Sequence, residues 1–165
     1  MKLILTLVLA LTSTALLPQS HADFAGTPSV ASKMRAHAFR LKPGQDFMIE
    51  IRKWAREHKI KAASIISVVG SFKKVNLRYA NQENGTAQEG FFEIVSMVGT
   101  FDDTSEHLHA SVSNGKGETF GGHLLTGNIV YTTADVVVAE LEDAKFSREH
   151  DAASGWDELV VRTKK

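Results

Sequence analysis

The second half of the chain consists of short runs in which apolar and polar residues alternate. Four such runs cover residues 91–98, 106–113, 119–125 and 129–141, with turn-forming residues between them. Alternation with a period of two is typical of a half-buried β-strand, because successive side chains of a strand point to opposite faces. We therefore expect β structure to dominate this half, in a mostly antiparallel sheet.

The period changes once in the first half, directly after Asp46. Apolar or aromatic side chains then recur at helical spacing, and the stripe consists of Phe47, Ile51, Trp54, Ala55 and His58. This spacing predicts the main helix of the fold. Asp46 suits the positive N-terminal end of that helix, and His58 is expected to be a packing or capping residue.

Three further strands are expected around this helix. Residues 34–41 alternate and stop at a Lys-Pro-Gly turn, residues 62–69 are almost continuously apolar, and residues 71–80 alternate again. The last two are predicted to pair with each other across Gly70-Ser71. The tail, residues 145–165, has enough apolar content to add a short segment or a final strand. The predicted fold class is α+β, with one main helix packed on the sheet.

The N-terminal residues have the composition of a targeting segment. Lys2 precedes an apolar run from Leu3 to Leu17, and small residues follow Pro18 up to Ala22. This pattern predicts a secretory signal peptide over residues 1–22, with residues 23–33 as a flexible lead-in and residues 34–165 as one domain. The protein is expected to be exported, periplasmic or secreted, with no membrane attachment after cleavage.

Composition excludes some classes of site. The chain has no cysteine, so disulfides and thiolate metal sites are excluded, and any metal must be bound by histidine and carboxylate side chains. Its 19 basic and 19 acidic residues balance, and the lysines and arginines are dispersed. Nucleic-acid binding, which depends on clustered positive charge, is therefore not expected.

Three histidines form the most distinctive chemical pattern of the sequence. His107 and His109 are two residues apart on a predicted strand and so share a face, while Leu108 points to the other side. His123 lies on the next strand, beyond an Asn-Gly-Lys-Gly turn. For His123 to point the same way as His109, the loop must have an odd length or the pairing must contain a bulge, and Gly121-Gly122 is predicted as that bulge.

Three neutral imidazoles are a ligand set for zinc or another late first-row metal. Three protein ligands would leave one coordination position open for water or a small ligand. The spacing is equally compatible with three half-exposed strand histidines that bind no metal.

Five segments together resemble one known family, the plants and prokaryotes conserved domain, abbreviated PPC. They are Arg40–Asp46, Val69–Ser71, Gly90–Ser96, His107–His109 and Gly121–Leu124, in this order. The resemblance implies a compact α+β domain, a homotrimer, and a zinc site at the three histidines. Plant relatives bind AT-rich DNA through a separate Arg-Gly-Arg-Pro hook, which this sequence lacks.

Three functions follow as hypotheses. The first is an exported homotrimeric module that binds zinc through His107, His109 and His123 and presents it to a small ligand. The second is a metal-dependent enzyme, in which zinc activates a water molecule and Glu93 or Glu106 is the general base. Strand alternation points Glu106 away from His107, which makes it the weaker of the two acids. The third is a DNA-binding or assembly module.

Overall fold

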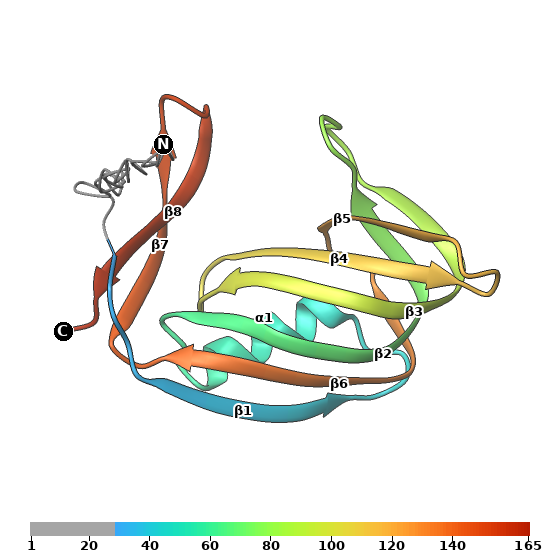
Figure 1. The fold of residues 1–165 in the computed structure, drawn as a ribbon, viewed down its shortest axis with the longest axis horizontal. Helices are drawn as coiled ribbons and strands as arrows, with labels where there is room; N and C mark the ends of the chain where they lie inside the picture. Colours follow the sequence, from blue (N-terminus) through green and yellow to red (C-terminus); the bar gives the residue numbers. More distant parts are fainter. Residues whose placement is uncertain (1–28) are drawn as a thin grey trace, which may run out of the picture.

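The computed structural model describes residues 29–165, which form mostly antiparallel β structure with one short helix (Figure 1). In chain order the elements are β1 (Met34–Leu41), α1 (Phe47–Glu57), β2 (Ala63–Arg78), β3 (Thr86–Phe101), β4 (Glu106–Asn114), β5 (Thr119–Leu124), β6 (Ile129–Leu141), β7 (Ala144–Asp151) and β8 (Trp156–Thr163). The predicted signal peptide lies outside the described residues. Within residues 29–165, no helix is long and apolar enough to cross a membrane.

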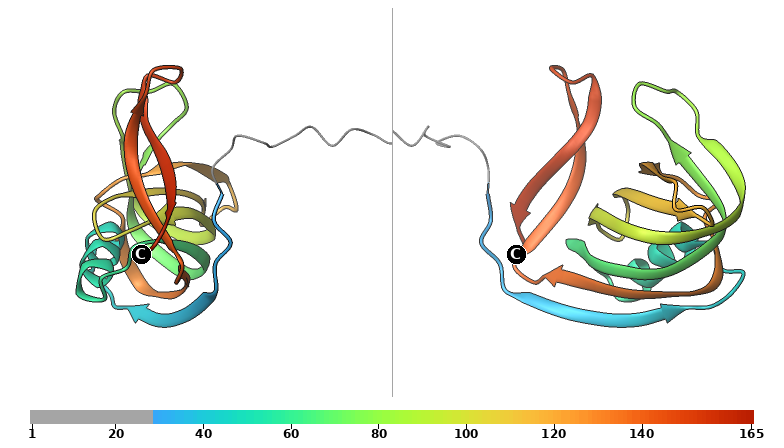
Figure 2. Two further views of the ribbon diagram at one scale, coloured as in Figure 1. Left: turned by 90° about the vertical axis from the view of Figure 1, so that its left-hand side faces the viewer. Right: turned by 45° about the vertical axis from the view of Figure 1, so that its right-hand side comes forward.

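Six strands form the main sheet, in the order β1-β6-β2-β3-β4-β5, and every neighbouring pair is antiparallel. β5 also pairs with the end of β2, so that β2, β3, β4 and β5 close on themselves. The resulting sheet is strongly curved, as the right-hand view of Figure 2 shows. The predicted α+β class is thus correct in outline, although β structure outweighs helix.

The helix α1 packs on one face of the sheet and begins where the sequence predicts. One carboxylate oxygen of Asp46 accepts hydrogen bonds from the backbone N–H groups of Met48 and Ile49, which caps the helix. Its other oxygen accepts from the backbone of Gly127, 2.7 Å away, and so ties the helix start to the β5–β6 connection. The helix buries Phe47, Met48, Ile51 and Ala55 in the core, and His58 forms its C-cap, as expected.

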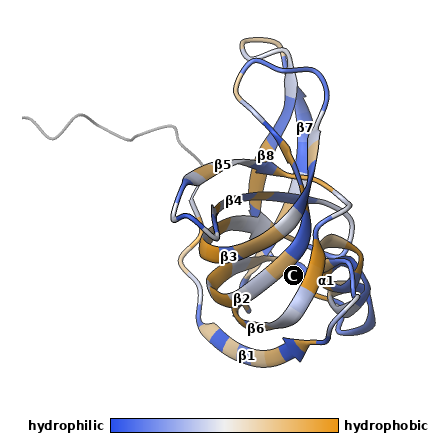
Figure 3. Cartoon of the chain, turned by 90° about the vertical axis from the view of Figure 1, so that its right-hand side faces the viewer, coloured by the Kyte–Doolittle hydropathy of each residue, from blue (hydrophilic) through white to orange (hydrophobic). Residues whose placement is uncertain are grey.

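In the part of the chain that the structure describes, no helix covers the opposite face of the sheet. A register shift between Ile94 and Ser96 interrupts the alternation of β3, so that the core residues Ile94 and Met97 are both buried while Val95 and Val98 are both exposed. The exposed apolar side chains of this face are called the outer patch here; they are Ile66, Val69, Phe91, Val95, Val98 and Tyr131. Figure 3 shows the alternation along the edge strand β1, in alternating hydrophilic and hydrophobic colours.

The prediction of two paired strands within residues 62–80 is wrong, because β2 is one continuous strand. Gly70, at the expected turn, has φ +142° and lies against β6, where a Cβ atom would be 2.0 Å from the carbonyl oxygen of Thr133. The glycine therefore serves a close approach between neighbouring strands and not a reversal of the chain. Both halves of β2 pair with β6 on one side and β3 on the other.

The tail forms a two-stranded ribbon, β7–β8, instead of the single segment expected from its composition. Its strands are in register from Ala144↔Thr163 to Asp151↔Trp156, and Gly155, with φ +77°, completes the turn. The base of the ribbon is held by a small cluster in which Ala144 and Phe146 pack on Ala62. From there the ribbon rises beside the curved sheet (Figures 1 and 2).

Candidate metal centre

The β4–β5 hairpin puts His109 and His123 directly opposite each other. The strands are in register from His109↔His123 to Ser113↔Thr119, which leaves five residues, 114–118, in the loop. The side-chain oxygen of Asn114 accepts hydrogen bonds from the backbone of Lys116 and Glu118 and so holds the loop closed. The loop thus has the odd length that a shared face requires.

The predicted bulge at Gly121-Gly122 is wrong, since the β4–β5 register runs through both glycines without a shift. The glycines instead allow β5 to fit between two strands. A Cβ atom on Gly121 would lie 2.6 Å from the carbonyl oxygen of Ala110 in β4, and one on Gly122 would lie 2.7 Å from that of Arg78 in β2. Only a residue without a side chain lets β5 approach both neighbours this closely.

For the candidate metal site, Gly122→Ala is therefore expected to weaken metal binding although it removes none of the three histidines. The new methyl group must push β5 away from β2, and His123 is the next residue. We expect zinc affinity to fall by about 10-fold to 100-fold, the range seen when the support of a ligand is lost. Competition titration with a chromogenic chelator measures the change. Gly115→Ala is the matched control, because no atom lies within 4 Å of its Cβ position; equal affinities of the two variants would contradict the prediction.

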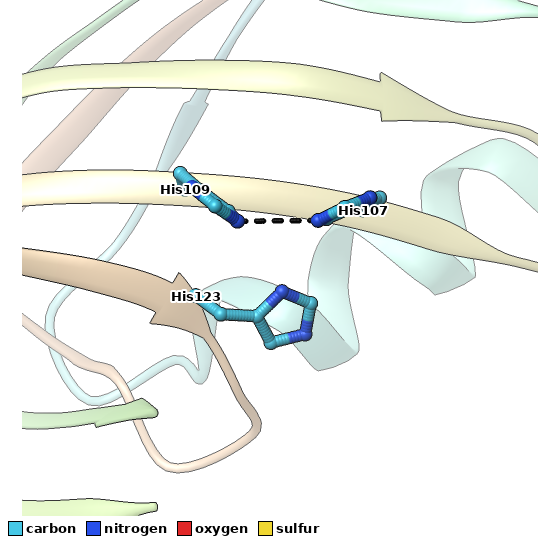
Figure 4. A group of neighbouring side chains, drawn as sticks. All are labelled: His107, His109 and His123. Atoms are coloured by element: carbon cyan, nitrogen blue, oxygen red, sulfur yellow. Dashed lines mark hydrogen bonds between the residues drawn. The ribbon is translucent and has the colours of Figure 1, made fainter. Parts of the chain in front are cut away.

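The three histidine rings converge on one point, as Figure 4 shows. Their centroids form a nearly regular triangle, 5.0 Å for His107 to His109, 5.1 Å for His107 to His123 and 5.5 Å for His109 to His123. The Nε2 atoms of His107 and His109 are 3.1 Å apart. One nitrogen of each ring lies within 4.8 Å of the other two. The structure thus brings together the three histidines that the sequence singled out.

The nitrogen atoms are spaced as a metal would need them. Nitrogen ligands of a tetrahedral zinc ion, with bonds of about 2.05 Å, lie about 3.3 Å from one another. The Nε2 atoms of His107 and His109 are close to this separation, and one nitrogen of His123 lies within 4.8 Å of both rings' ligand nitrogens. The Nδ1 atom of His123 is buried and has no hydrogen-bond partner among the described residues. A bound cation would satisfy this orphaned atom.

Burial and neighbouring charge keep two of the rings, His107 and His123, in the form that binds metals. Burial lowers the pKa of His123 to about 4, and the positive charge of Arg78 acts in the same direction. Burial also lowers the pKa of His107, with Arg148 as the next cause. Both imidazoles are therefore neutral at pH 7, with a lone pair available, so that a metal does not have to displace a proton.

The two candidate acids lie in different places. Glu106 forms an ion pair with Arg52 of α1, and it also contributes to the cleft next to the histidines. Glu93 is exposed on β3, opposite Ser113, which is four residues along β4 from His109. Four residues of strand correspond to about 13 Å, so Glu93 is not brought to the histidines.

A cleft of about 1200 Å³ opens above His107 and His123. One wall is the loop between β2 and β3, and the other is the β7–β8 ribbon. Sequence reasoning did not find the wall residues, which are Arg78, Asn81, Gln82 and Glu83 on one side and Arg148, His150, Gly155, Trp156, Asp157 and Glu158 on the other. No local pattern marks them, because they meet only through the curvature of the sheet and the rise of the ribbon.

Comparison with known proteins identifies one family and solved structures with the same fold. The model of the Plants and Prokaryotes Conserved (PCC) domain matches residues 28–142. A protein from Salmonella enterica of known structure is 40% identical, with a TM-score of 0.81 over 82% of this chain and 99% of that chain. The structure of a metal-containing protein from Archaeoglobus fulgidus, 24% identical, matches with a TM-score of 0.66 over 80% of this chain and 99% of that one and shows the same fold.

A curated relative is much longer than this chain. The bifunctional protein GlmU of a Synechococcus strain is 35% identical over 144 residues, which make up 87% of this chain. The same segment makes up 23% of the cyanobacterial protein, so the chain spans about a quarter of that relative's length.

Proposed function

The chain belongs to the Plants and Prokaryotes Conserved domain family, and from this premise we propose that it is a metal-binding module. His107, His109 and His123 would hold a divalent metal, with zinc as the first candidate. The observation that carries the proposal is the convergence of three imidazole nitrogens within 4.8 Å of one another. Three protein ligands leave one position of a tetrahedral metal open, and a small ligand would bind there.

Two further observations support a metal at this place. The buried, unpartnered Nδ1 of His123 would otherwise leave an unsatisfied polar atom, which costs about 1–3 kcal/mol. The fold is shared with the Archaeoglobus fulgidus protein described as metal-containing. Nitrogen-only ligand sets suit zinc, copper, nickel and other late first-row metals and do not suit magnesium or calcium.

Metal analysis of the protein, purified without a histidine tag, tests the proposal. After dialysis against zinc and removal of the excess, we expect one zinc ion per chain by mass spectrometry of the metal. Zinc should also raise the thermal midpoint of unfolding, because a ligand that binds only the folded state stabilises it. A wild-type protein that stays metal-free after this treatment would overturn the proposal.

We propose in addition that the module is a homotrimer assembled through the outer patch. A cluster of exposed apolar side chains on a sheet face that no described helix covers is a feature of interaction sites. Val69, Phe91 and Val98 are each about 60% exposed, and the ring of Phe91 packs against that of Tyr131 in a tilted arrangement, with centroids 4.5 Å apart. The family resemblance supports the number of subunits.

Val95→Asp is expected to break this assembly. A charge in the middle of a buried apolar contact must be desolvated without a partner, which the association energy cannot offset. Light scattering coupled to size exclusion should show the molar mass falling to about one third of the wild-type value. Ile49→Asp is the control, since Ile49 is an exposed apolar residue of α1, on the other side of the sheet. A wild type that already runs as a monomer would contradict the prediction.

Export is also proposed, on the composition of residues 1–22. The basic start, the apolar run and the small residues up to Ala22 support a cleaved signal peptide. Intact mass spectrometry of protein from the extracytoplasmic fraction is expected to give a chain that starts at Asp23. Recovery of the uncleaved chain in the cytoplasm alone would contradict export.

A further inference from the structure

Two arginines, Arg78 and Arg148, line the cleft above the histidines and form no ion pair with any acidic residue that the structure describes. Arg78 donates only a long hydrogen bond of 3.4 Å to the carbonyl oxygen of Gln82, and Arg148 only one of 3.5 Å to the hydroxyl of Thr100. Within residues 29–165, the arginines that form ion pairs are Arg35, Arg52 and Arg162, none of which contributes to the cleft. Each of the two cleft arginines therefore has several guanidinium N–H groups without an acceptor among the described residues.

Strand register places both arginines beside the metal ligands. Arg78 is directly opposite His123 in the β2–β5 pairing. Arg148 reaches from the ribbon to Thr100, which is directly opposite His107 in the β3–β4 pairing. The two positive charges thus flank the histidines from different elements, at the floor of the cleft.

A site that binds a metal cation is not stabilised by two additional positive charges such as those of Arg78 and Arg148. Arginines placed here make the folded protein and metal binding less favourable through repulsion, unless an anion is present to pair with them. Planar guanidinium groups bind carboxylates and phosphates through two parallel hydrogen bonds, and such charge-assisted bonds are among the strongest in proteins.

We propose that the cleft binds a ligand through an anionic group, a carboxylate or a phosphate, which bridges the three-histidine metal and the guanidinium groups of Arg78 and Arg148. This inference rests on the proposed metal-binding function. One oxygen of the anionic group takes the open coordination position, and a second oxygen accepts hydrogen bonds from the arginines.

Acidic residues in the cleft walls restrict what else the ligand can carry. Glu83 lies on one side of the cleft and Asp157 and Glu158 lie on the other, so that a second negative charge on the ligand is disfavoured. Trp156 lines the same wall and is 68% exposed, which offers a flat apolar surface to the body of a ligand. The fitting class is a small organic molecule with one anionic end and a neutral body.

Isothermal titration of the zinc-loaded protein, freed of excess zinc, tests this inference. The probes are inorganic phosphate, acetate and, as the neutral analogue of acetate, acetamide. We expect saturable binding of at least one anion and none of acetamide. Tighter binding of phosphate identifies a phosphate-type ligand, and tighter binding of acetate identifies a carboxylate-type ligand. Zinc-loaded protein that binds neither anion overturns the inference and leaves the metal proposal intact.

Variants then assign the binding to the two arginines. Arg148→Gln and Arg78→Gln should each keep one zinc ion per chain and weaken binding of the preferred anion by about 10-fold to 100-fold, as expected for loss of a charge-assisted pair. Arg162→Gln is the matched control on the ribbon, where Arg162 pairs with Glu149 outside the cleft. Unchanged anion affinity in both cleft variants would overturn the inference. A wild type without zinc would remove the metal proposal and this inference together.

Discussion

His123→Ala is expected to abolish stoichiometric zinc binding. The substitution removes one of three nitrogen ligands and leaves two imidazoles on a single strand, which cannot surround a metal ion. Loss of a group that only supports a ligand lowers metal affinity by about 10-fold to 100-fold, so loss of the ligand itself should cost more than about 100-fold. Equilibrium dialysis against a zinc buffer, with metal counted by mass spectrometry, measures the effect.

His150→Ala is the control for this experiment. His150 lines the same cleft and is exposed, but it is not part of the converging group. Its variant should bind zinc as the wild type does, while His109→Ala should lose zinc as His123→Ala does. If His123→Ala retained wild-type affinity, the three rings would not be a metal site.

Phe72→Ala is expected to cause the largest loss of stability, about 3–5 kcal/mol in the free energy of unfolding. Phe72 is fully buried in the middle of β2, and its ring meets Phe47 of α1 edge to face, with centroids 6.1 Å apart. It also lies opposite Phe92 of β3 and Val130 of β6, so the cavity would open where the helix meets three strands. Such a loss is a large part of the stability of a domain of this size.

Denaturant unfolding, carried out with excess chelator so that metal does not contribute, measures this change. The transition midpoint should fall while the slope stays constant, which identifies a change in stability and not in the unfolded chain. Phe72→Leu keeps most of the buried volume and should cost only about 1–2 kcal/mol. Equal losses in the two variants would show that cavity size does not govern the effect.

The local parts of the fold were predictable because short-range patterns determine them. The period of apolar residues after Asp46 and the capping carboxylate specify α1, and strict alternation specifies β1 at the bounds that the structure has. Residues 62–80 were misread as two strands because Gly70 has the same sequence appearance in a turn and at a close strand contact. Only the position of β6, more than 60 residues further on, distinguishes the two.

The candidate site likewise contains residues that local patterns predict and residues that depend on long-range contacts. The proximity of His107, His109 and His123 was predictable from the sequence, because strand alternation and one hairpin loop determine their relative positions. The proximity of Arg78 and Arg148 was not, since they are 70 residues apart in the sequence and reach the histidines through pairing with β5 and through the rise of the β7–β8 ribbon. The prediction of a bulge at Gly121-Gly122 was wrong because the narrow space between β4 and β2, which requires these glycines, is likewise a long-range property.

The origin of the cleft in separate pieces of chain has a consequence for how such a protein can diversify. The three histidines lie on paired strands that also carry core residues, so substitutions that shift these strands would disturb both the fold and the proposed metal site. The cleft walls include the turns of two hairpins, residues 79–85 and 152–155, which belong to no strand. Substitutions in these two turns can therefore change which ligand the cleft accepts, while the three histidines of the proposed metal site stay the same.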